Sequence, residues 1–131
     1  MKIVKSPPDG SCFFHSVGLQ CALTARYLRK SCAELVDLQA ESDFNGLKLK
    51  EWIKYETGLS VAEYSRRIGH SAWGGALEAH LLSNWLKRPI GIYKLDSRKK
   101  AVLITDFRPK SPYGKTIFLL YNGHSHYDAL A

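Results

Sequence analysis

The 131-residue sequence is poor in cysteine, and its cysteines lack the spacing of structural sites. Cys12, Cys21 and Cys32 include no C-x-x-C pair, and an odd number does not suit a framework of disulfides. Without paired cysteine and histidine spacing, a structural zinc site is not expected either. Cys21 and Cys32 fall on apolar helical faces, so we interpret both as core residues. Reduced thiols are typical of the cytosol, and the sequence therefore predicts a cytoplasmic protein.

Long hydrophobic runs are also absent. No apolar stretch approaches the roughly 20 residues that span a bilayer, and the opening MKIVKSPPDG has no apolar segment typical of a signal peptide. We therefore expect no membrane association. We find no internal repeat or linker, and 45% hydrophobic content suits one domain over residues 1–131 with a single core.

The charge balance is positive, with a formal net charge of +7 at pH 7. Such an excess can indicate a nucleic-acid partner. The basic residues are scattered, however, and no nucleic-acid-binding signature accompanies them. They are Arg26, Arg29, Lys30, Lys48, Lys50, Lys54, Arg66, Arg67, Arg98, Lys99 and Lys100. We interpret them as a solvated surface and expect no nucleic-acid partner. Salt-sensitive binding that survives loss of the Cys12 thiol would indicate the alternative, a basic nucleic-acid-binding domain.

The period of the apolar residues changes along the chain. The first two-thirds have helical spacing, with a capping box at Ser60–Glu63, a stop at Gly69 and another at Pro89. Expected helices cover residues 13–23, 25–39, 46–55, 60–69 and 74–88. The last third contains short runs typical of strands, at residues 89–96, 101–107 and 116–123. Helices followed by an antiparallel sheet indicate an α+β domain.

The stretch SPPDGSCFFHSVGLQ, residues 6–20, places Cys12 at the first turn of a predicted helix. The partial positive charge and unpaired N–H groups of a helix N-terminus stabilise a thiolate, which predicts a lowered thiol pKa. The preceding Asp9-Gly10-Ser11 loop can turn its amides toward a developing oxyanion, and Gly10 permits the unusual backbone angles this needs. The setting indicates a nucleophile; the alternative is a small buried residue.

A base can come from the other end of the chain, LLYNGHSHYDALA. If strand geometry continues there, His126 and Asp128 lie on one face and Tyr127 on the other. An acid beside a histidine holds the imidazole in a useful tautomer, and Cys, His and Asp together form an acyl-transfer set. The alternative for this segment is a polar strand end. His124 is the competitor for His126, but it has no acid two positions on.

Three motifs together resemble those of the ovarian-tumour (OTU) family of deubiquitinases. DGSCFFHSV is similar to the cysteine motif of the family. AWGGALEAHLLSNWLKRPIGIY resembles its central motif, in which a Trp-Gly loop leads into a helix with an acidic residue and then a strand. IFLLYNGHSHYDAL resembles its terminal motif, a strand and loop followed by His-Tyr-Asp. The motifs occur in the family's order and span nearly the whole chain.

The resemblance implies a papain-like cysteine protease fold, with a helical N-terminal part packed on a small, mainly antiparallel sheet. It also implies hydrolysis of the isopeptide bond between the ubiquitin C-terminus and lysine, through a thioester and without metal or cofactor. Cys12 would be the nucleophile, His126 the general base and then acid, and Asp128 the residue that orients His126. The expected partner is ubiquitin or polyubiquitin, bound by a monomer.

The resemblance assigns two loops around the catalytic centre. Asp9, Gly10 and Ser11 would shape the oxyanion loop, although Ser11 stands where the family often has Asn. Trp73, Gly74 and Gly75 would lie beside the centre, where small residues leave a channel that a Gly-Gly tail can pass. From the residues alone, this second run is a helix N-terminus with a packed aromatic.

Three alternatives stay open at the level of sequence. The enzyme could act on another ubiquitin-like modifier or on a polyprotein, because the chemistry is shared. The chain could instead be a ubiquitin-binding module without activity, although Cys12, His126 and Asp128 are all present. In origin it could be a compact viral or bacterial member, acting in the host cytosol, or a catalytic domain of a larger protein.

Overall fold

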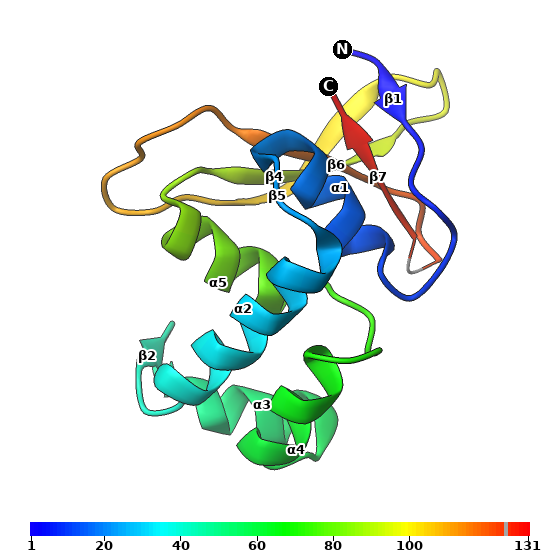
Figure 1. Cartoon of the computed structure of the whole chain (residues 1–131). Helices are drawn as coiled ribbons and strands as arrows, with labels where there is room; N and C mark the ends of the chain where they lie inside the picture. Colours follow the sequence, from blue (N-terminus) through cyan, green and yellow to red (C-terminus); the bar gives the residue numbers. More distant parts are fainter. Residues whose placement is uncertain (125) are drawn as a thin grey trace.

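The computed structural model of the chain describes residues 1–124 and 126–131. Its helices lie in the first two-thirds of the chain and most of its main sheet comes from the last third, and its two ends lie side by side (Figure 1). The elements are β1 (Ile3–Val4), α1 (Cys12–Cys21), α2 (Ala25–Leu38), β2 (Asp43–Phe44), β3 (Leu47–Lys48), α3 (Leu49–Thr57), α4 (Val61–Ile68), α5 (Ala76–Leu86), β4 (Ile90–Leu95), β5 (Ala101–Phe107), β6 (Ile117–Tyr121) and β7 (Tyr127–Leu130).

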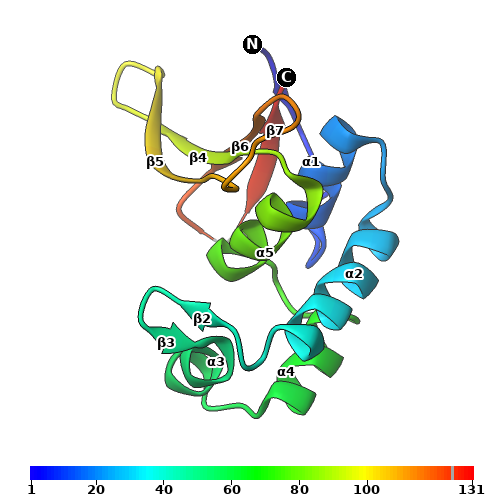
Figure 2. The same ribbon diagram turned by 90° about the vertical axis from the view of Figure 1, so that its left-hand side faces the viewer.

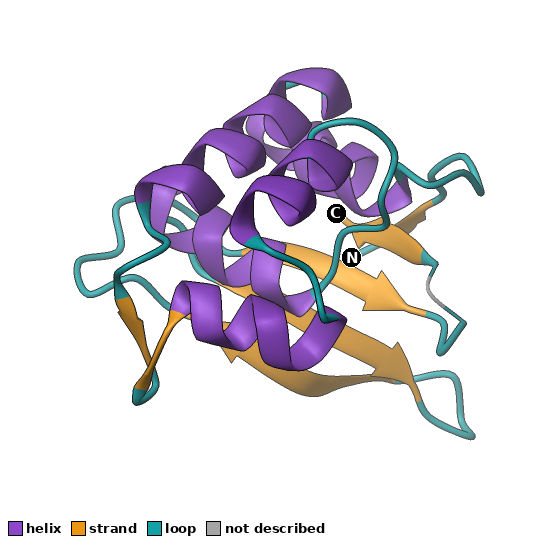
Figure 3. Cartoon of the chain, turned by 90° about the horizontal axis from the view of Figure 1, so that it is seen from below, coloured by secondary structure: helices purple, strands orange, loops and turns teal. Residues whose placement is uncertain are grey.

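Five strands form the main sheet, in the order β1-β7-β6-β4-β5. All neighbours are antiparallel except β4 and β6, because the 108–116 connection brings β6 back beside β4 in the same direction. Helices α1 and α5 contact this sheet, and the other helices extend away from it (Figures 2 and 3). The predicted α+β class is confirmed.

The expected helix at residues 46–55 is wrong at its beginning. Asn45 and Gly46 both adopt positive φ angles, 53° and 95°, and turn the chain between β2 and β3. Asn-Gly is the sequence typical of a two-residue hairpin turn, since both central positions need this conformation. Helix α3 therefore begins only at Leu49, after the hairpin.

The predicted capping box of α4 forms only in part. The Ser60 side chain accepts a hydrogen bond from the backbone N–H of Glu63, as expected for an N-cap. The Glu63 carboxylate pairs with Arg66 and Arg67 one turn further along the helix. In a full capping box the Glu63 carboxylate would accept the backbone N–H of Ser60. Its ion pairs with Arg66 and Arg67 hold it along the helix instead.

Two short strands at the chain ends were not predicted. β1 pairs with β7, with Ile3 opposite Leu130 and Val4 opposite Ala129. Strands of two and four residues are too short to show a period, and their pairing depends on contacts across the whole chain. The consequence is that the residues after His126 lie between β1 and β6, inside the sheet.

Helix α1 supplies the centre of the hydrophobic core. Phe13, Phe14 and Val17 are completely buried, and the Phe13 ring meets those of Phe14 and Tyr127 edge to face. Contacts run from α1 to β7, β6 and α2, so the helix joins the sheet to the helical part. Within the described residues, every helix is too short or too polar to cross a membrane.

Gly18 is required where α1 ends. Ala22 closes the helix with a φ of 58°, and the N–H groups of Ala22 and Leu23 both donate to the Gly18 carbonyl. This turn brings the Leu23 carbonyl oxygen within 2.2 Å of the position that a Cβ on Gly18 would occupy. A side chain at this position therefore collides with backbone, which cannot move as a flexible side chain can.

We predict that Gly18→Ala lowers the free energy of unfolding by about 1–3 kcal/mol, the usual cost of overpacking. Chemical denaturation measures the change. The control is Leu19→Ala on the exposed side of the same turn, which should change stability by less than about 0.5 kcal/mol. Equal stabilities for Gly18→Ala and the wild type would contradict the close approach at Leu23.

Candidate active site

Cys12 lies at the meeting point of the two ends of the chain. It begins α1 and is fully buried, and its Sγ accepts the backbone N–H of Tyr127 at 3.4 Å. The two residues are 115 positions apart, so only the fold brings them together. The thiol therefore lies beside the strand that follows His126.

The net direction of the Cys12 pKa differs from the sequence expectation. Burial raises the pKa of the thiol above its ordinary value, and the charges of Asp9 and Asp128 act in the same direction. Hydrogen bonds from the backbone N–H groups of Tyr127 and Phe13 lower it, but by less than burial raises it. The predicted lowering is thus wrong as a net effect, because withdrawal from water penalises the thiolate most.

His126 and Asp128 form a direct pair. The Nε2 of His126 lies 2.8 Å from Asp128 Oδ1, and both side chains are largely shielded from solvent. The competitor His124 is exposed, and its backbone N–H donates to the Asn122 side chain. Of the two histidines, His126 is therefore the one held by an acid.

Ser6 and Ser16 form a short hydrogen-bonded chain that holds Asp128 and the backbone next to it. The backbone N–H of Ser6 donates to Asp128 Oδ1 at 2.9 Å, and the Ser6 and Ser16 hydroxyls are 2.7 Å apart. The Ser16 hydroxyl donates a hydrogen bond to the Tyr127 carbonyl at 3.1 Å. Because its one hydrogen is used there, the Ser6 hydroxyl is the donor in the Ser6–Ser16 bond. Helix α1 thus carries both Cys12 and, one turn later, a group that fixes the backbone beside Asp128.

The Asp9-Gly10-Ser11 loop is folded back on itself. Ser11 N–H donates to Asp9 Oδ1 at 2.8 Å, and Cys12 N–H to the Asp9 carbonyl at 3.2 Å. Gly10 does not adopt a positive φ, so the predicted need for unusual backbone angles is wrong. Space is tight at this position, since a Cβ would lie 3.0 Å from the Ser71 carbonyl oxygen, closer than most Cβ contacts.

The Trp73-Gly74-Gly75 run leads into α5. Trp73 is 52% exposed, so the expectation of a packed aromatic is wrong. A Cβ on Gly74 would collide with the Phe13 ring at 2.6 Å, whereas one on Gly75 would meet only the Tyr127 hydroxyl, at 3.8 Å. Gly74 is thus required by packing, and Gly75 lies in open space next to Tyr127.

Three residues of this region were missed in the sequence, Ser6, Ser16 and Arg29, and Glu78 was noted only as the acidic residue of the central motif. Ser16 could have been found from its position four residues after Cys12 on one helix face. Arg29 was assigned to the solvated surface, which is wrong: it is 4% exposed and bonded to the loop before Cys12. Its place next to Leu28 and three residues before Cys32, on the apolar stripe of α2, was the available signal.

Comparison with known proteins identifies the family. A family model described as OTU-like cysteine protease matches residues 7–129. The chain belongs to this family. The predicted papain-like OTU fold and the prediction of a cysteine peptidase are thereby confirmed.

Three relatives illustrate the similarity. The chain is 32% identical over 135 residues to the ovarian tumor domain-containing deubiquitinating enzyme 4 of Arabidopsis thaliana, covering 98% of this chain and 42% of that protein. It is 27% identical over 130 residues to the RNA-directed RNA polymerase L of Crimean-Congo hemorrhagic fever virus, covering 98% of this chain and 3% of that protein. The ubiquitin-bound Hazara virus OTU superposes with a TM-score of 0.78 at 26% identity, covering 99% of this chain and 80% of that one. The chain therefore spans less than half the length of these two curated relatives.

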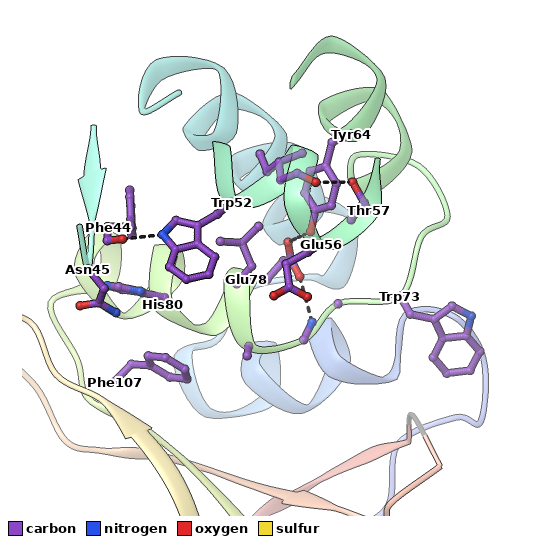
Figure 4. Close-up of a pocket in the computed structure, with 15 residues that line it drawn as sticks. Phe44, Asn45, Trp52, Glu56, Thr57, Tyr64, Trp73, Glu78, His80 and Phe107 are labelled. Atoms are coloured by element: carbon purple, nitrogen blue, oxygen red, sulfur yellow. Dashed lines mark hydrogen bonds between the residues drawn. The ribbon is translucent and has the colours of Figure 1, made fainter. Parts of the chain in front are cut away.

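A pocket of about 450 Å³ lies on the helical side of the Trp73 loop of this OTU domain (Figure 4). Its lining includes Phe44, Trp52, His80 and Phe107, but none of the triad candidates at positions 12, 126 and 128. Trp73 borders the pocket but points away from it (Figure 4). Throughout the described residues, no group of three or more His, Cys, Asp and Glu side chains is placed to hold a metal.

Glu78 joins this pocket to the loop beside the candidate site. Its carboxylate accepts the Gly75 N–H at 2.9 Å, closing the N-terminus of α5, and also accepts the Tyr64 hydroxyl. Burial raises the pKa of Glu78 from 4.5 to about 7, against the effect of these bonds and of the Arg29 charge. The acid in the helix of the central motif therefore fixes Gly75 from inside the protein.

We predict that Glu78→Gln flattens the dependence of stability on pH. An acid whose pKa is higher in the folded state stabilises the fold fully below its unfolded pKa, and this contribution is lost as pH rises from 4.5 to about 7. For Glu78 it amounts to at most about 3 kcal/mol. Urea denaturation of wild type and variant at pH 4.5, 6 and 7.5 measures the difference. Parallel curves would contradict the raised pKa.

Proposed function

We propose that this OTU domain is a deubiquitinase, which hydrolyses the isopeptide bond between the ubiquitin C-terminus and a lysine amine. The observation that carries the proposal is the contact of Cys12 with the backbone of Tyr127, between the paired residues His126 and Asp128. The ubiquitin-bound Hazara virus relative, similar over nearly the whole chain, supports ubiquitin as the partner.

The first half of the reaction forms a thioester. The Asp128 carboxylate accepts a hydrogen bond from Nε2–H of His126, which leaves the unprotonated Nδ1 of the neutral ring as the base. Nδ1 takes the Cys12 proton as sulfur attacks the isopeptide carbonyl, and the carbonyl electron pair moves to oxygen. Collapse of this tetrahedral intermediate breaks the C–N bond, and His126 returns the proton to the leaving lysine amine.

The second half releases ubiquitin. Water enters where the amine has left, and His126 removes one of its protons as the oxygen attacks the thioester carbonyl. The C–S bond then breaks, and the proton passes to the Cys12 sulfur. The Asp9-Gly10-Ser11 loop and Cys12 would supply the backbone donors for the oxyanion in both steps, and the Ser11 and Cys12 N–H groups would then exchange their bonds to Asp9 for bonds to the oxyanion.

Access to the thiol depends on the Trp73 loop in this proposal. Gly75 has open space beside Tyr127, where a larger residue would project toward the strand that follows His126. A Gly-Gly tail has no side chains to place in such a passage, whereas bulkier tails do. Ubiquitin ends in such a tail, which accounts for selection of the cleaved bond.

Other expectations remain predictions. Residues 1–131 would act as one catalytic domain, as a monomer in the cytosol, without metal, cofactor or nucleic acid.

We predict that Cys12→Ala abolishes reaction with a ubiquitin probe carrying a thiol-reactive C-terminus, and lowers isopeptide hydrolysis by at least about 10³-fold. Mass spectrometry should show an adduct one ubiquitin heavier for the wild type. Cys21→Ala, a control at the other end of the same helix, should form the adduct normally. A folded wild type that forms none would refute ubiquitin as substrate, and probes of other ubiquitin-like modifiers would then be tried.

We predict that His126→Ala lowers kcat by at least about 10²-fold, the usual contribution of a general base, whereas His124→Ala leaves kcat within about twofold. Steady-state kinetics with a fluorogenic ubiquitin substrate measures both. Larger loss from His124→Ala would show that His124 is the base.

A further inference from the structure

Arg29 is a buried cation bonded entirely to uncharged groups. Its Nε donates to Ser11 Oγ at 3.0 Å, Nη2 to the Gly10 carbonyl at 2.7 Å, and Nη1 to the carbonyls of Ile68 at 2.9 Å and Ala72 at 2.8 Å. The guanidinium carbon lies 4.6 Å from the centre of the Phe14 ring. No carboxylate of the described residues lies within ion-pairing distance.

Three of the four acceptors belong to two loops that border the candidate site, and the fourth, the Ile68 carbonyl, lies at the end of α4. Gly10 and Ser11 directly precede Cys12, and Ala72 directly precedes Trp73. The planar guanidinium makes bonds in fixed directions, so it sets the distance and orientation of one loop relative to the other. Arg29 itself comes from α2, which is anchored through Leu28 and Cys32 in the core.

One peptide plane is held from both sides by this arrangement. The Gly10 carbonyl points to Arg29, and the N–H of the same peptide, on Ser11, points to Asp9 Oδ1. If this peptide rotated, its carbonyl oxygen would turn toward the residues around Cys12 and present negative charge where an oxyanion develops. Rotation is opposed by the short bond to Arg29.

Burial of the charge is costly, which argues for more than a structural role. Burial lowers the pKa of Arg29, and the nearby acidic groups Asp9, Cys32, Glu78 and Cys12 act against this when they are ionised. A buried cation without a bonded anion is replaced in most cores by apolar packing, because desolvation of the charge outweighs its hydrogen bonds. Here the charge is bonded to the Gly10 carbonyl and the Ser11 hydroxyl, directly before the thiol in the chain.

We infer that Arg29 is a positioning residue for the reaction, which holds the Gly10 carbonyl on its guanidinium and ties the Gly10–Ser11 peptide to the Trp73 loop, so that this carbonyl does not oppose the developing oxyanion. The inference rests on the proposed function. It requires that loss of Arg29 slow the formation of the tetrahedral intermediate, with little effect on the binding of ubiquitin. Chemistry at the thiol that forms no oxyanion should be less affected.

The test compares wild type, Arg29→Met and Arg29→Lys, with Arg26→Met as the control on the exposed side of α2. The measurements are kcat and KM for a fluorogenic ubiquitin substrate, with active sites counted by a ubiquitin probe. The rate of Cys12 alkylation by iodoacetamide, a displacement without an oxyanion, is measured in parallel. Thermal denaturation shows which variants are folded.

For Arg29→Met we expect kcat per active site to fall by about 10–10³-fold, as for loss of oxyanion stabilisation, with KM within about threefold. Alkylation should fall far less, and Arg26→Met should match the wild type. Arg29→Lys, which keeps the charge but not the forked bonds, should lie between the two, and it decides the question if Arg29→Met does not fold.

Two results would overturn the inference alone. One is a folded Arg29 variant with lower melting temperature but wild-type kcat per active site, which would make the role structural. The other is an equal loss of hydrolysis and alkylation, which would mean that Arg29 acts on the thiol and not on the loop. A folded wild type that hydrolyses no ubiquitin substrate would instead overturn the proposed function, and with it this inference.

Discussion

The contact between α1 and β7 is the constraint on which the rest of the structure depends. It joins residues more than 100 positions apart through the thiol of Cys12, the hydroxyl of Ser16 and the ring of Phe13, all of which meet Tyr127. β7 can take this place only because β1 and β6 pair with it on either side. The core and the candidate active site are therefore one set of contacts.

Buried polar groups connect this centre to the helical part. Arg29 and Glu78 are both nearly inaccessible to water, and each bonds backbone groups of a loop at the site. Among the described residues, no buried side-chain nitrogen or oxygen lacks a hydrogen-bond partner. Since an unsatisfied buried polar group costs about 1–3 kcal/mol, each of these bonds limits how far the loops can move. The helical part thus fixes the loops that the sheet alone would leave unsupported.

Sequence predicted the elements with a clear period and failed where partners decide the structure. β5 was expected at residues 101–107 and lies at Ala101–Phe107, because its apolar run is bounded by turns. β1 and β7 carry no such signal, since their pairing depends on both ends of the chain. Residue types likewise indicated Cys12, His126 and Asp128. Two features depend instead on tertiary packing: the burial that raises the Cys12 pKa, and the burial of the Arg29 side chain. Asn45-Gly46 is a typical hairpin-turn sequence, but the apolar residues that follow have helical spacing, and the predicted helix was therefore extended over Gly46.

Burial of Cys12 links the stability of the fold to the demands of the proposed chemistry. Burial of Cys12 raises the pKa of the thiol by more than the amides of Tyr127 and Phe13 lower it, so the uncharged thiol is favoured until a base removes its proton. A base that must act during attack needs a fixed ring orientation more than one that meets a preformed thiolate. The Ser6 amide donates to Asp128, and the Ser6 hydroxyl is bonded in turn to Ser16 on α1. Asp128 is thereby fixed, and it fixes the orientation of the His126 ring. The helix that carries the buried thiol thus also carries the group that keeps its base in place.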